Sequence, residues 1–524
     1  LKVLVCFYGC FGGLSINFSS LTTLVFSKPM LALRLLFMLP VVWATAVDVE
    51  ACSDETCDDV SLLQLRGTKG MLTAGSRVLH VAPTSAAHAR DSGDSGSRAT
   101  PYATVEYAAK QAQPGDTILM LPGVYHNEHY GDGDIWKEGE HTIVIRKVKG
   151  APGNPITLMA EKLGDVVIRG DGRIILELKK CKHWRVKNLE IEGEVARTPL
   201  EEALRWQFAF KRSAKSEVEF RVDPSWSKDR IKELKLPILK EVLRPSKYNT
   251  HGLNVHTSYD VEVSNCHIHH IPGSALKFRK SDYIVARNNE IHDSTGLATG
   301  GNHALTVNYM SAKDSPSDYH AVLTGNKVYN NVNYVYSWVP SKSFITPEVD
   351  EGKGISVQFC WRKDGFKAGR ILIANNIAYG NGFSGIHVNK GERVDILFNT
   401  VVDNDATEHG RNHGITSAES SDIRIENNVV TTHATWQAAA VRAADGSSDI
   451  VVRNNVVFGS VEKVAAEVQE GTMDAEPAFE DQESGDFELA AGSRGKGECH
   501  PLPEVTDDAE GNARSATPSC GAYE

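Results

Sequence analysis

The sequence predicts an all-β chain whose main part is a single-stranded, right-handed parallel β-helix of about ten turns. Two observations lead to this prediction. A short strand of the form Gly/Ala-Leu/Ile-x-Val/Phe recurs from residue 252 onward, and a second strand that ends in Asn follows it again and again. Because a strand of period 2 buries only alternate residues, one such unit needs neighbours stacked above and below it.

The spacing of the second strands gives the length of the repeat. Seven positions align at their ends, with spacings of 23, 37, 50, 23, 29 and 27 residues: Cys266, Asn289, Asn326, Asn376, Asn399, Asn428 and Asn455. Turns of about two dozen residues, with insertions, are therefore the unit. Asn suits such a corner because it tolerates left-handed backbone and its amide can bond to the next turn. A Greek-key sandwich is the alternative fold, but Asn-Gly hairpin signals are nearly absent.

Residues 1–46 are expected to be a leader. Its second half, 30–46, has the form of a secretory signal: a Met, an Arg, an apolar run and the A-x-A sequence of Ala44 to Ala46. We expect cleavage after Ala46, a secreted, extracellular protein and no membrane association after removal of the signal. A membrane anchor is the alternative reading.

The cysteines fit an oxidising compartment. Secretion would permit two bridges of modest loop length, Cys52–Cys57 and Cys499–Cys520. Cys181 and Cys266 lie inside strand-like runs, and we expect them to be buried thiols.

Composition divides the rest of the chain. Residues 47–100 are expected to be a flexible linker or pro-segment, and 101–460 the β-helix, which begins with a capping helix in the amphipathic stretch that opens 105–125. The insertion 195–250 carries 13 Lys/Arg and 8 Asp/Glu and is partly helical in pattern over 231–243, with a break at Pro237. Residues 461–524 form an acidic closing segment with 16 Asp/Glu and 4 Lys/Arg.

The charge distribution excludes some classes of function. The formal net charge is −11, and because the closing segment alone contributes −12, the rest of the chain sums to about +1. A near-neutral body gives no case for nucleic-acid binding. No nucleotide-binding, zinc or Ser-His-Asp signature rises above chance.

Three segments resemble parts of secreted pectin-lyase-like β-helix proteins, in particular polysaccharide lyases of families six and nine. Residues 101–125 resemble their N-terminal cap and first turn, 150–172 the next turn, and 476–493 the closing segment. The resemblance covers about 101–194 and 251–524. It implies the fold, which hosts lyases, hydrolases, epimerases and adhesins.

Alternation along the repeated strands predicts which side chains point outward. In each copy the aliphatic positions face inward, and in-register stacking places the others about 4.8 Å from their neighbours on the next turn. The outward positions are Asn254, His256, Lys277, Arg279, Thr306, Asn308, Ser356, Gln358, His387, Asn389, Thr416 and Ala418. The sequence therefore predicts a polar groove that binds an acidic polysaccharide.

Lys277 and Arg279 are the leading catalytic candidates. A uronate lyase needs a positive group at the substrate carboxylate and a base that removes the C5 proton. A neighbouring cation lowers the pKa of a lysine, so Lys277 beside Arg279 can meet both needs. Two exposed basic residues that are merely solvated are the alternative. His387 is a further catalytic candidate. His251, His303 and His413 directly precede repeated strands, a position that suits a structural corner as well as catalysis.

The resemblance to family six adds Lys280. Lys280-Ser281 stand where that family has its catalytic Lys-Ser, although alternation turns Lys280 inward unless it lies at a turn. This chain has Asn308 where the family has Arg, and Ala275 where the family has its calcium-binding Glu. Family nine uses a Lys base with an aspartate-rich calcium site, and no equivalent cluster stands on these strands.

Other residues bear on ligands. Trp338 and Trp361 are expected to stack on sugar rings, or else to pack the insertions onto the helix. Asp132-x-Asp134 and Asp350-Glu351 are possible calcium ligands, and the cofactor is otherwise unknown. Because the outward positions hold no carboxylate, the pattern argues against hydrolysis.

We therefore expect a secreted, monomeric β-helix protein that acts on a uronate-containing polysaccharide, most concretely by β-elimination. A non-catalytic glycan-binding or cell-surface protein is the alternative.

Overall fold

The computed structural model describes residues 76–524 apart from 212, 214, 219–220, 222, 224, 234–242, 311, 313, 315–316, 337–348, 350, 362–368, 405, 408–412, 433–438, 445 and 464–465. The predictions for the leader, its cleavage site and the Cys52–Cys57 bridge lie outside these residues. No helix among the described residues is long and apolar enough to cross a membrane.

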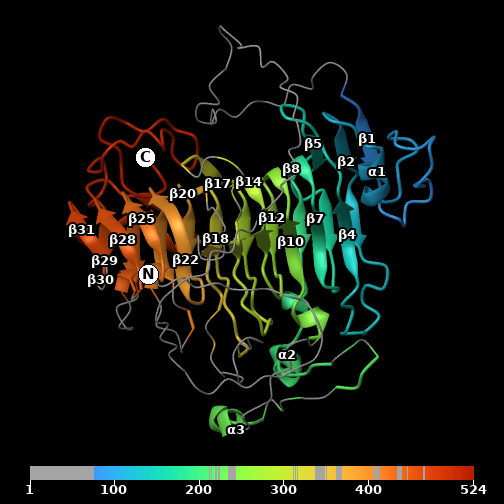
Figure 1. Cartoon of the computed structure of the whole chain (residues 1–524), viewed down its shortest axis with the longest axis horizontal. Helices are drawn as coiled ribbons and strands as arrows, with labels where there is room; N and C mark the ends of the chain where they lie inside the picture. Colours follow the sequence, from blue (N-terminus) through green and yellow to red (C-terminus); the bar gives the residue numbers. More distant parts are fainter. Residues whose placement is uncertain are drawn as a thin grey trace, which may run out of the picture. The chain divides into compact units, whose positions relative to one another are not determined.

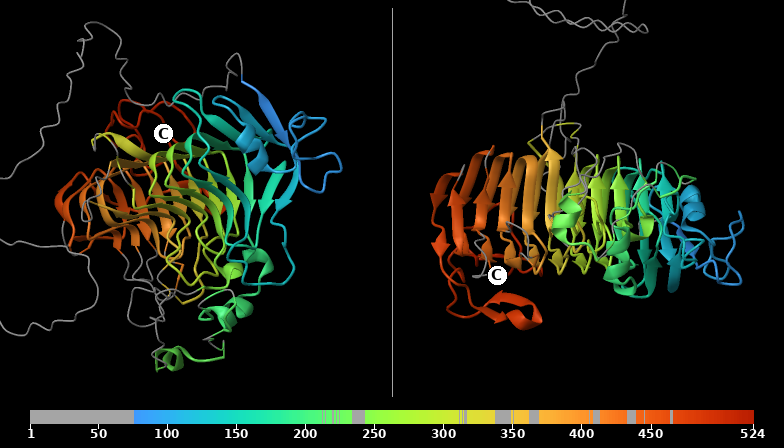
Figure 2. Two further views of the ribbon diagram at one scale, coloured as in Figure 1. Left: turned by 45° about the vertical axis from the view of Figure 1, so that its right-hand side comes forward. Right: turned by 90° about the horizontal axis from the view of Figure 1, so that it is seen from below.

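The described chain winds through three parallel sheets in turn, as predicted, and each strand pairs with its counterpart one turn away (Figures 1 and 2). The strands of one face, sheet C, are β4 (His141–Arg146), β7 (Ile174–Lys179), β10 (His251–His256), β13 (Leu276–Arg279), β16 (Leu305–Asn308), β19 (Ile355–Cys360), the first half of β22 (Ser384–Leu397), β24 (His413–Ala418), β27 (Ala439–Ala443) and β30 (Ser460–Lys463).

Sheet A follows sheet C along the chain. Its strands are β1 (Val78–Val81), β2 (Thr117–Met120), β5 (Ile156–Ala160), β8 (Lys182–Lys187), β11 (Tyr259–Ser264), β14 (Asp282–Arg287), β17 (Tyr319–Thr324), β20 (Arg370–Ala374), the second half of β22, β25 (Ser421–Glu426), β28 (Ser448–Arg453) and β31 (Ala466–Glu470).

Sheet B completes each turn with short strands. They are β3 (Gly123–His126), β6 (Val166–Arg169), β9 (Glu190–Glu192), β12 (His267–His269), β15 (Glu290–His292), β18 (Lys327–Tyr329), β21 (Ile377–Tyr379), β23 (Thr400–Asn404), β26 (Val429–Thr432), β29 (Val456–Phe458) and β32 (Met473–Asp474). These 11 strands within the described residues agree with a helix of about ten turns.

The core is built from columns of aliphatic side chains, because in-register pairing stacks equivalent positions. One column of sheet C contributes residues that are all fully buried: Leu176, Leu253, Leu276, Leu305, Ile355, Ile386 and Ile415. The free thiols of Cys181 and Cys266 are buried as predicted, and Cys360 is a third.

The Asn-bearing corner between sheets A and B is confirmed. One residue of the corner forms the side-chain hydrogen bonds, and the residue before it has the left-handed backbone. Side-chain amides form a continuous chain in which Asn326 donates to Asn376 over 2.9 Å and Asn376 donates to Asn399 over 3.0 Å. The left-handed backbone belongs to the residue before, such as Asn375 with φ of 57°. The ladder Asn thus supplies hydrogen bonds, and its predecessor supplies the turn.

The N-terminal cap begins earlier than predicted. The capping helix α1 (Val105–Gln111) is present, with Thr104 accepting from the backbone N–H of Tyr107. However, β1 lies within the stretch expected to be a linker and pairs in parallel with β2. Its alternating Val-Leu-His-Val sequence buries Leu79 and Val81, which explains why this stretch joins the sheet.

The C-terminal boundary also moves. Sheet strands continue through β30, β31 and β32, so the β-helix extends past residue 460 to Asp474. The segment that follows forms an antiparallel pair, β33 (Phe479–Asp481) with β34 (Asp486–Leu489), and contains the predicted Cys499–Cys520 disulfide. It packs on the side of the helix, where its Arg514 guanidinium lies 3.9 Å from the centre of the Phe398 ring.

The insertion 195–250 is partly helical, as predicted. It holds α2 (Leu200–Trp206) and α3 (Lys228–Glu233), together with short 3-10 turns at Val195–Arg197 and Ser246–Tyr248; a third such turn, Gln482–Ser484, lies in the closing segment. Most of the segment predicted to be helical, 231–243, lies outside the described residues.

Candidate active site

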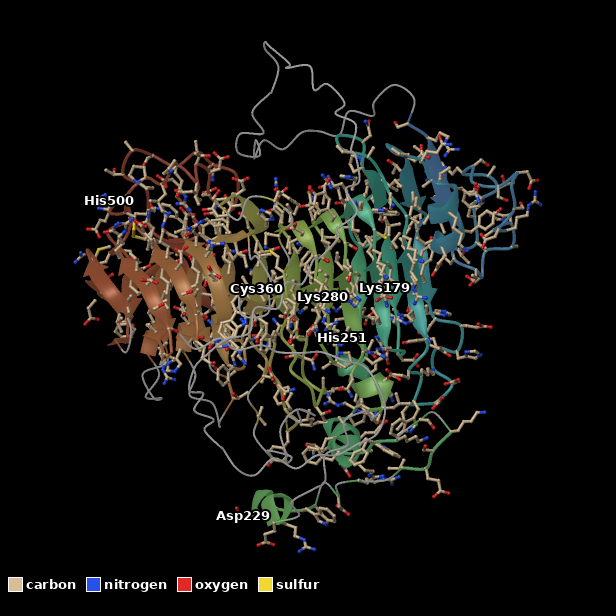
Figure 3. All side chains as sticks on the ribbon, viewed as in Figure 1. Lys179, Asp229, His251, Lys280, Cys360 and His500 are labelled. Atoms are coloured by element: carbon tan, nitrogen blue, oxygen red, sulfur yellow. A yellow bond between two sulfur atoms is a disulfide. The ribbon has the colours of Figure 1, made fainter. Side chains whose placement is uncertain are left out.

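The outer face of sheet C carries the predicted polar groove residues in the predicted register. Asn254 pairs with Lys277, which pairs with Thr306, and the same row continues through Ser356, His387 and Thr416. A second row, two residues further along each strand, contains His256, Arg279, Asn308, Gln358 and Asn389. Figure 3 labels Lys179, Lys280 and Cys360 along one edge of this sheet and His251 toward the opposite edge.

These side chains are more buried than alternation alone predicts. Thr306 is 2% exposed and Ser356 is 0% exposed, and Asn254 and Gln358 are also buried. His256, Arg279, Asn308, His387 and Asn389 are half-buried. Three side-chain oxygens on the strands around Lys277 have no hydrogen-bond partner in the described part of the chain: those of Asn254, Thr306 and Asn308. Buried polar atoms normally find partners, so these oxygens favour a polar ligand in this part of the groove.

Lys277 has the properties of a base. It is half-buried, and within the described residues it has no hydrogen-bond or ion-pair partner. Burial lowers the pKa of Lys277 to about 8; the Arg279 charge acts in the same direction, and Glu351 acts against it. A sizeable fraction of this amine is therefore neutral near pH 8 and able to accept a proton.

Arg279 lies beside an aromatic pair. Its guanidinium carbon is 5.5 Å from the centre of the Tyr309 ring, and Tyr309 stacks on Phe359 with centroids 4.9 Å apart. The ammonium group of Lys390 lies 5.7 Å from the Phe359 ring on the next turn. Planar rings flanked by cations are a surface on which an anionic sugar can stack.

Lys280 lies at a turn and not on the strand. Its φ of 51° is left-handed, its side chain is exposed, and its backbone N–H donates to the carbonyl of Asn308 over 2.9 Å. It occupies the same turn position as Tyr309 and Phe359 on the following turns. This geometry answers the orientation question left open by alternation. It places Lys280 at the edge of the groove, next to the aromatic pair.

His387 is held near other ionisable groups at the opposite edge. Its Nδ1 lies 2.5 Å from the Thr416 hydroxyl, and burial, with Lys353 and His413 nearby, lowers its pKa well below the usual value. His303 has a similarly lowered pKa, again because of burial first, and Lys277 contributes. The neutral imidazole of His303 lies 3.2 Å from Gln358 Nε2. His387 is therefore neutral at pH 7 and suited to hydrogen bonding or proton acceptance.

Of the remaining residues predicted to bind the ligand, the structure describes Asn389 and Trp361 but not Trp338. Asn389 donates to the Gln358 side-chain oxygen over 3.2 Å, so the two form one polar surface. Trp361 is half-buried, and the Lys390 ammonium group lies 5.9 Å from its ring. Trp338 lies outside the described residues.

Two of the four carboxylates considered for calcium lie beside basic side chains. Asp132 lies 2.8 Å from Lys137, and Glu351 lies 3.2 Å from His303 and 3.5 Å from Lys353. Asp350 lies outside the described residues. Because a lysine already neutralises Asp132 and another lies beside Glu351, these two residues do not fit a calcium site, and no step below is assigned to calcium.

Sequence reasoning missed three residues of this face and the setting of a fourth. Glu351, predicted only as a possible calcium ligand, lies with Lys353 beside His303, and Tyr309 and Phe359 form the aromatic edge. Tyr309 and Phe359 could have been found, since each directly follows the second outward position of its strand. Glu351 and Lys353 come from the end of an insertion, and no repeat pattern places insertions in space.

Comparison with known proteins bears on the fold. A family model described as a right handed beta helix region matches residues 246–473. No curated protein matches the chain. Among solved structures, pectate lyase Pel9A is 16% identical, with a TM-score of 0.48, and the match covers 86% of this chain and 96% of that one.

Two further structures show similar coverage at lower scores. A rhamnogalacturonan lyase is 13% identical, with a TM-score of 0.38 and coverage of 84% and 96%. The A-module of the Azotobacter vinelandii mannuronan C-5 epimerase AlgE6 is 17% identical, with a TM-score of 0.36 and coverage of 71% and 94%. The strand pairing and the family model together identify the fold of this chain as a right-handed parallel β-helix.

Proposed function

We propose that this protein is a polysaccharide lyase that cleaves a uronate-containing glycan by β-elimination in the groove on sheet C. The observation that carries the proposal is Lys277. It is a half-buried amine with a pKa of about 8 and no ion-pair partner among the described residues, two positions from Arg279 on the same strand.

The reaction assigns a role to each cation. Arg279 pairs with the substrate carboxylate, and this withdraws electron density and acidifies the C5 proton. The neutral Lys277 amine removes that proton, the electron pair forms the C4–C5 double bond, and the C4–oxygen bond breaks. The departing sugar oxygen takes up a proton from water, so that charge and atoms balance. The product has an unsaturated uronate at its new end.

The polar neighbours position the sugar. The unpartnered oxygens of Asn254 and Thr306 accept hydrogen bonds from sugar hydroxyls on either side of Lys277. Tyr309 and Phe359 offer ring faces for stacking, and Lys280 and Lys390 attract further carboxylates along the chain. Acidic polysaccharide is thus the substrate class that the charge and ring pattern favours. The names of the similar solved structures, two lyases and an epimerase of polysaccharides, agree with this class.

A non-catalytic glycan-binding protein is the second candidate. It is supported by Asn308, which stands where the resembling lyase family has Arg, and by the aromatic edge, which requires no chemistry. The two candidates share a ligand and differ in whether a bond breaks.

One assay separates them. Alginate, pectate and glycosaminoglycans are each incubated with the protein, with and without added calcium, and absorbance from unsaturated uronates is followed. Lys277→Ala should lower kcat by about 10²- to 10⁴-fold. Arg279→Ala should mainly raise KM and reduce the salt dependence of binding.

Lys187→Ala is the matched control, since this lysine points outward from β8 on sheet A, away from the groove strands. Absence of product with every glycan, together with weakened glycan retention in both groove variants, would favour the binding protein. Cleavage that survives both groove substitutions would place the site elsewhere, and His387 and Lys280 would be tested next.

We also propose that the protein is secreted and acts as a monomer. The Cys499–Cys520 disulfide supports an oxidising compartment. N-terminal sequencing of the exported protein should find Val47 as the first residue; retention of Met30 would contradict export by this signal.

A further inference from the structure

A cluster of histidines and glutamates lies on the outer face of sheet B, on strands other than those of the groove. Two rows of this face run through consecutive turns. One row contains Glu190, His267 and Glu290, and the other contains Glu192, His269 and His292. Three successive turns, those of β9, β12 and β15, therefore present imidazole and carboxylate groups to the same side.

The groups are close enough to share one ion. His267 Nε2 lies 2.6 Å from His292 Nε2, and the centres of the two rings are 4.9 Å apart. One ligand atom from each of His267, Glu290 and His292 falls within 4.8 Å of the others, and the same holds for Glu190, His267 and His269. His267 belongs to both sets. Two imidazole nitrogens this close must share a proton between them or share a cation.

The hydrogen bonds behind the candidate ligands favour the set of His267, Glu290 and His292. Nδ1 of His292 lies 2.7 Å from an Asp293 carboxylate oxygen, which leaves Nε2 of His292 directed at His267. Glu290 accepts a hydrogen bond of 2.8 Å from the Tyr329 hydroxyl. A carboxylate behind a ligating histidine and a hydrogen bond to a ligating carboxylate are the usual supports of a metal site.

His269 is engaged differently. Its Nδ1 lies 2.6 Å from His270 Nδ1, and its Nε2 lies 3.2 Å from Glu190. Both ring nitrogens of His269 are therefore occupied within the protein.

We propose that His267, His292 and Glu290 bind a divalent transition-metal ion, with Zn²⁺ the ion that this donor set fits best. Two imidazole nitrogens and one carboxylate oxygen are ligands that zinc accepts, and they are less suited to calcium or magnesium, which prefer oxygen alone. The ion would join two adjacent turns of the helix through side chains, in addition to the backbone pairing of β12 with β15. Its role would be to stabilise this region, independently of the chemistry in the groove.

The test is zinc binding by the full chain, measured by isothermal titration calorimetry and by the visible d–d absorption of bound Co²⁺. We expect one ion per chain that depends on the cluster. His267→Gln and Glu290→Gln should each weaken Zn²⁺ binding by more than about 10-fold, the lower end of the loss caused by removing an outer-shell partner. Asp293→Asn should weaken it by about 10- to 100-fold while leaving the ligands in place.

His126→Gln is the matched control. His126 is an exposed histidine of β3 in the same outward row, several turns from the cluster, and should bind no differently after substitution. His269→Gln should retain binding. Circular dichroism checks that each variant is folded, and Zn²⁺ should raise the Tm of the parent protein but not that of His267→Gln.

Several outcomes would overturn the proposal. If the parent protein binds no Zn²⁺ ion that depends on the cluster, the histidines share a proton and not a metal ion. Equal binding by the parent and by both His267→Gln and Glu290→Gln would place the ion elsewhere. Loss of binding in His269→Gln with retention in Glu290→Gln would assign the ion to the other set.

Discussion

Lys277 and Arg279 lie two residues apart on one strand. They can play different parts in β-elimination only if one of them loses its proton far more easily than the other. Arginine side chains in general carry a permanent positive charge, whereas burial lowers the pKa of Lys277 to about 8. The strand thus presents one permanent positive charge and one titratable amine to the same side. This division of roles is what β-elimination requires, and solvated lysines on a surface would not supply it.

The pH dependence of kcat/KM tests this division. Lys277 must be neutral to accept a proton, so activity should rise about tenfold per pH unit below pH 8 and level off above it. The sign follows from the lowered pKa: acid protonates the amine and removes the base. Measuring kcat/KM between pH 5 and 10 in a series of buffers checks this prediction. A maximum on the acid side, near pH 5, would contradict a lysine base.

Alternation predicted which residues of sheet C stack in register, and the strand pairing confirms that register. What alternation could not predict is the burial of Thr306 and Ser356, because it counts only the direction of a side chain and not what surrounds it. Lys280 shows a second limit. The residue after Arg279 adopts left-handed backbone, as does Tyr309 after β16, so counting in steps of two fails at that point. The zinc cluster was missed because the sequence analysis treated the residues of sheet B only as Asn-bearing corners.

At the scale of elements, the corners hold the turns in register. The backbone pairs of the three sheets repeat every turn, and the buried Asn amides add side-chain hydrogen bonds in the same direction. Asn376 is fully buried and donates both to the Asn399 side chain and to the backbone carbonyl of Leu323. A ladder of this kind penalises slippage by one residue, because every amide would then lose its partner.

Asn376→Ala should therefore be costly. It removes the donor to the buried carbonyl of Leu323 and the acceptor of the Asn326 backbone N–H, and we expect the free energy of unfolding to fall by about 2–3 kcal/mol. Asn330→Gly is the control. Asn330 is exposed and has a φ of 53°, which Gly adopts freely. The free energy of unfolding of this variant should therefore change by less than about 0.5 kcal/mol. Urea titration measures both. Equal losses would show that the ladder contributes nothing specific.

The closing segment depends on a different element, the Cys499–Cys520 disulfide. It closes a loop with a sequence separation of 21 residues, and Cys499 and Cys520 are both buried against the side of the helix. Replacing both by Ser should lower the free energy of unfolding by about 3 kcal/mol, because the unfolded segment gains freedom. In thermal melts, reductant should lower the Tm of the parent protein to that of the double Ser variant. The Tm of the double Ser variant itself should not change with reductant.

At the scale of the molecule, the sequence predicted the central β-helix better than the two ends of the described chain. The repeat spacing sufficed for the β-helix because each turn contacts chiefly its two neighbours, so that local patterns determine the fold. The ends lack such a pattern. β1 was assigned to a linker, and β30 to β32 were assigned to the closing segment on composition, since composition alone does not distinguish an acidic strand from an acidic loop.

The nearest-neighbour character of the fold makes a whole turn removable. Ser384 pairs with His413 and Ile386 with Ile415, so deleting residues 385–413 joins Ser384 to Gly414 at an equivalent position. Asn376 would then meet Asn428 in place of Asn399, and the core columns would close over the gap. The deletion should fold, as judged by circular dichroism and a cooperative melt.

Its Tm should nevertheless fall, because the closing segment loses two contacts. Arg514 lies over the Phe398 ring, and the backbone N–H of Ala522 donates to the Thr400 hydroxyl over 2.9 Å; both partners lie in the deleted turn. Deleting only residues 385–398 is the control, since removing half a turn brings strands of different sheets into register and should abolish folding. If both deletions unfold the protein, turns are not independent units; if both fold, the register between turns does not matter.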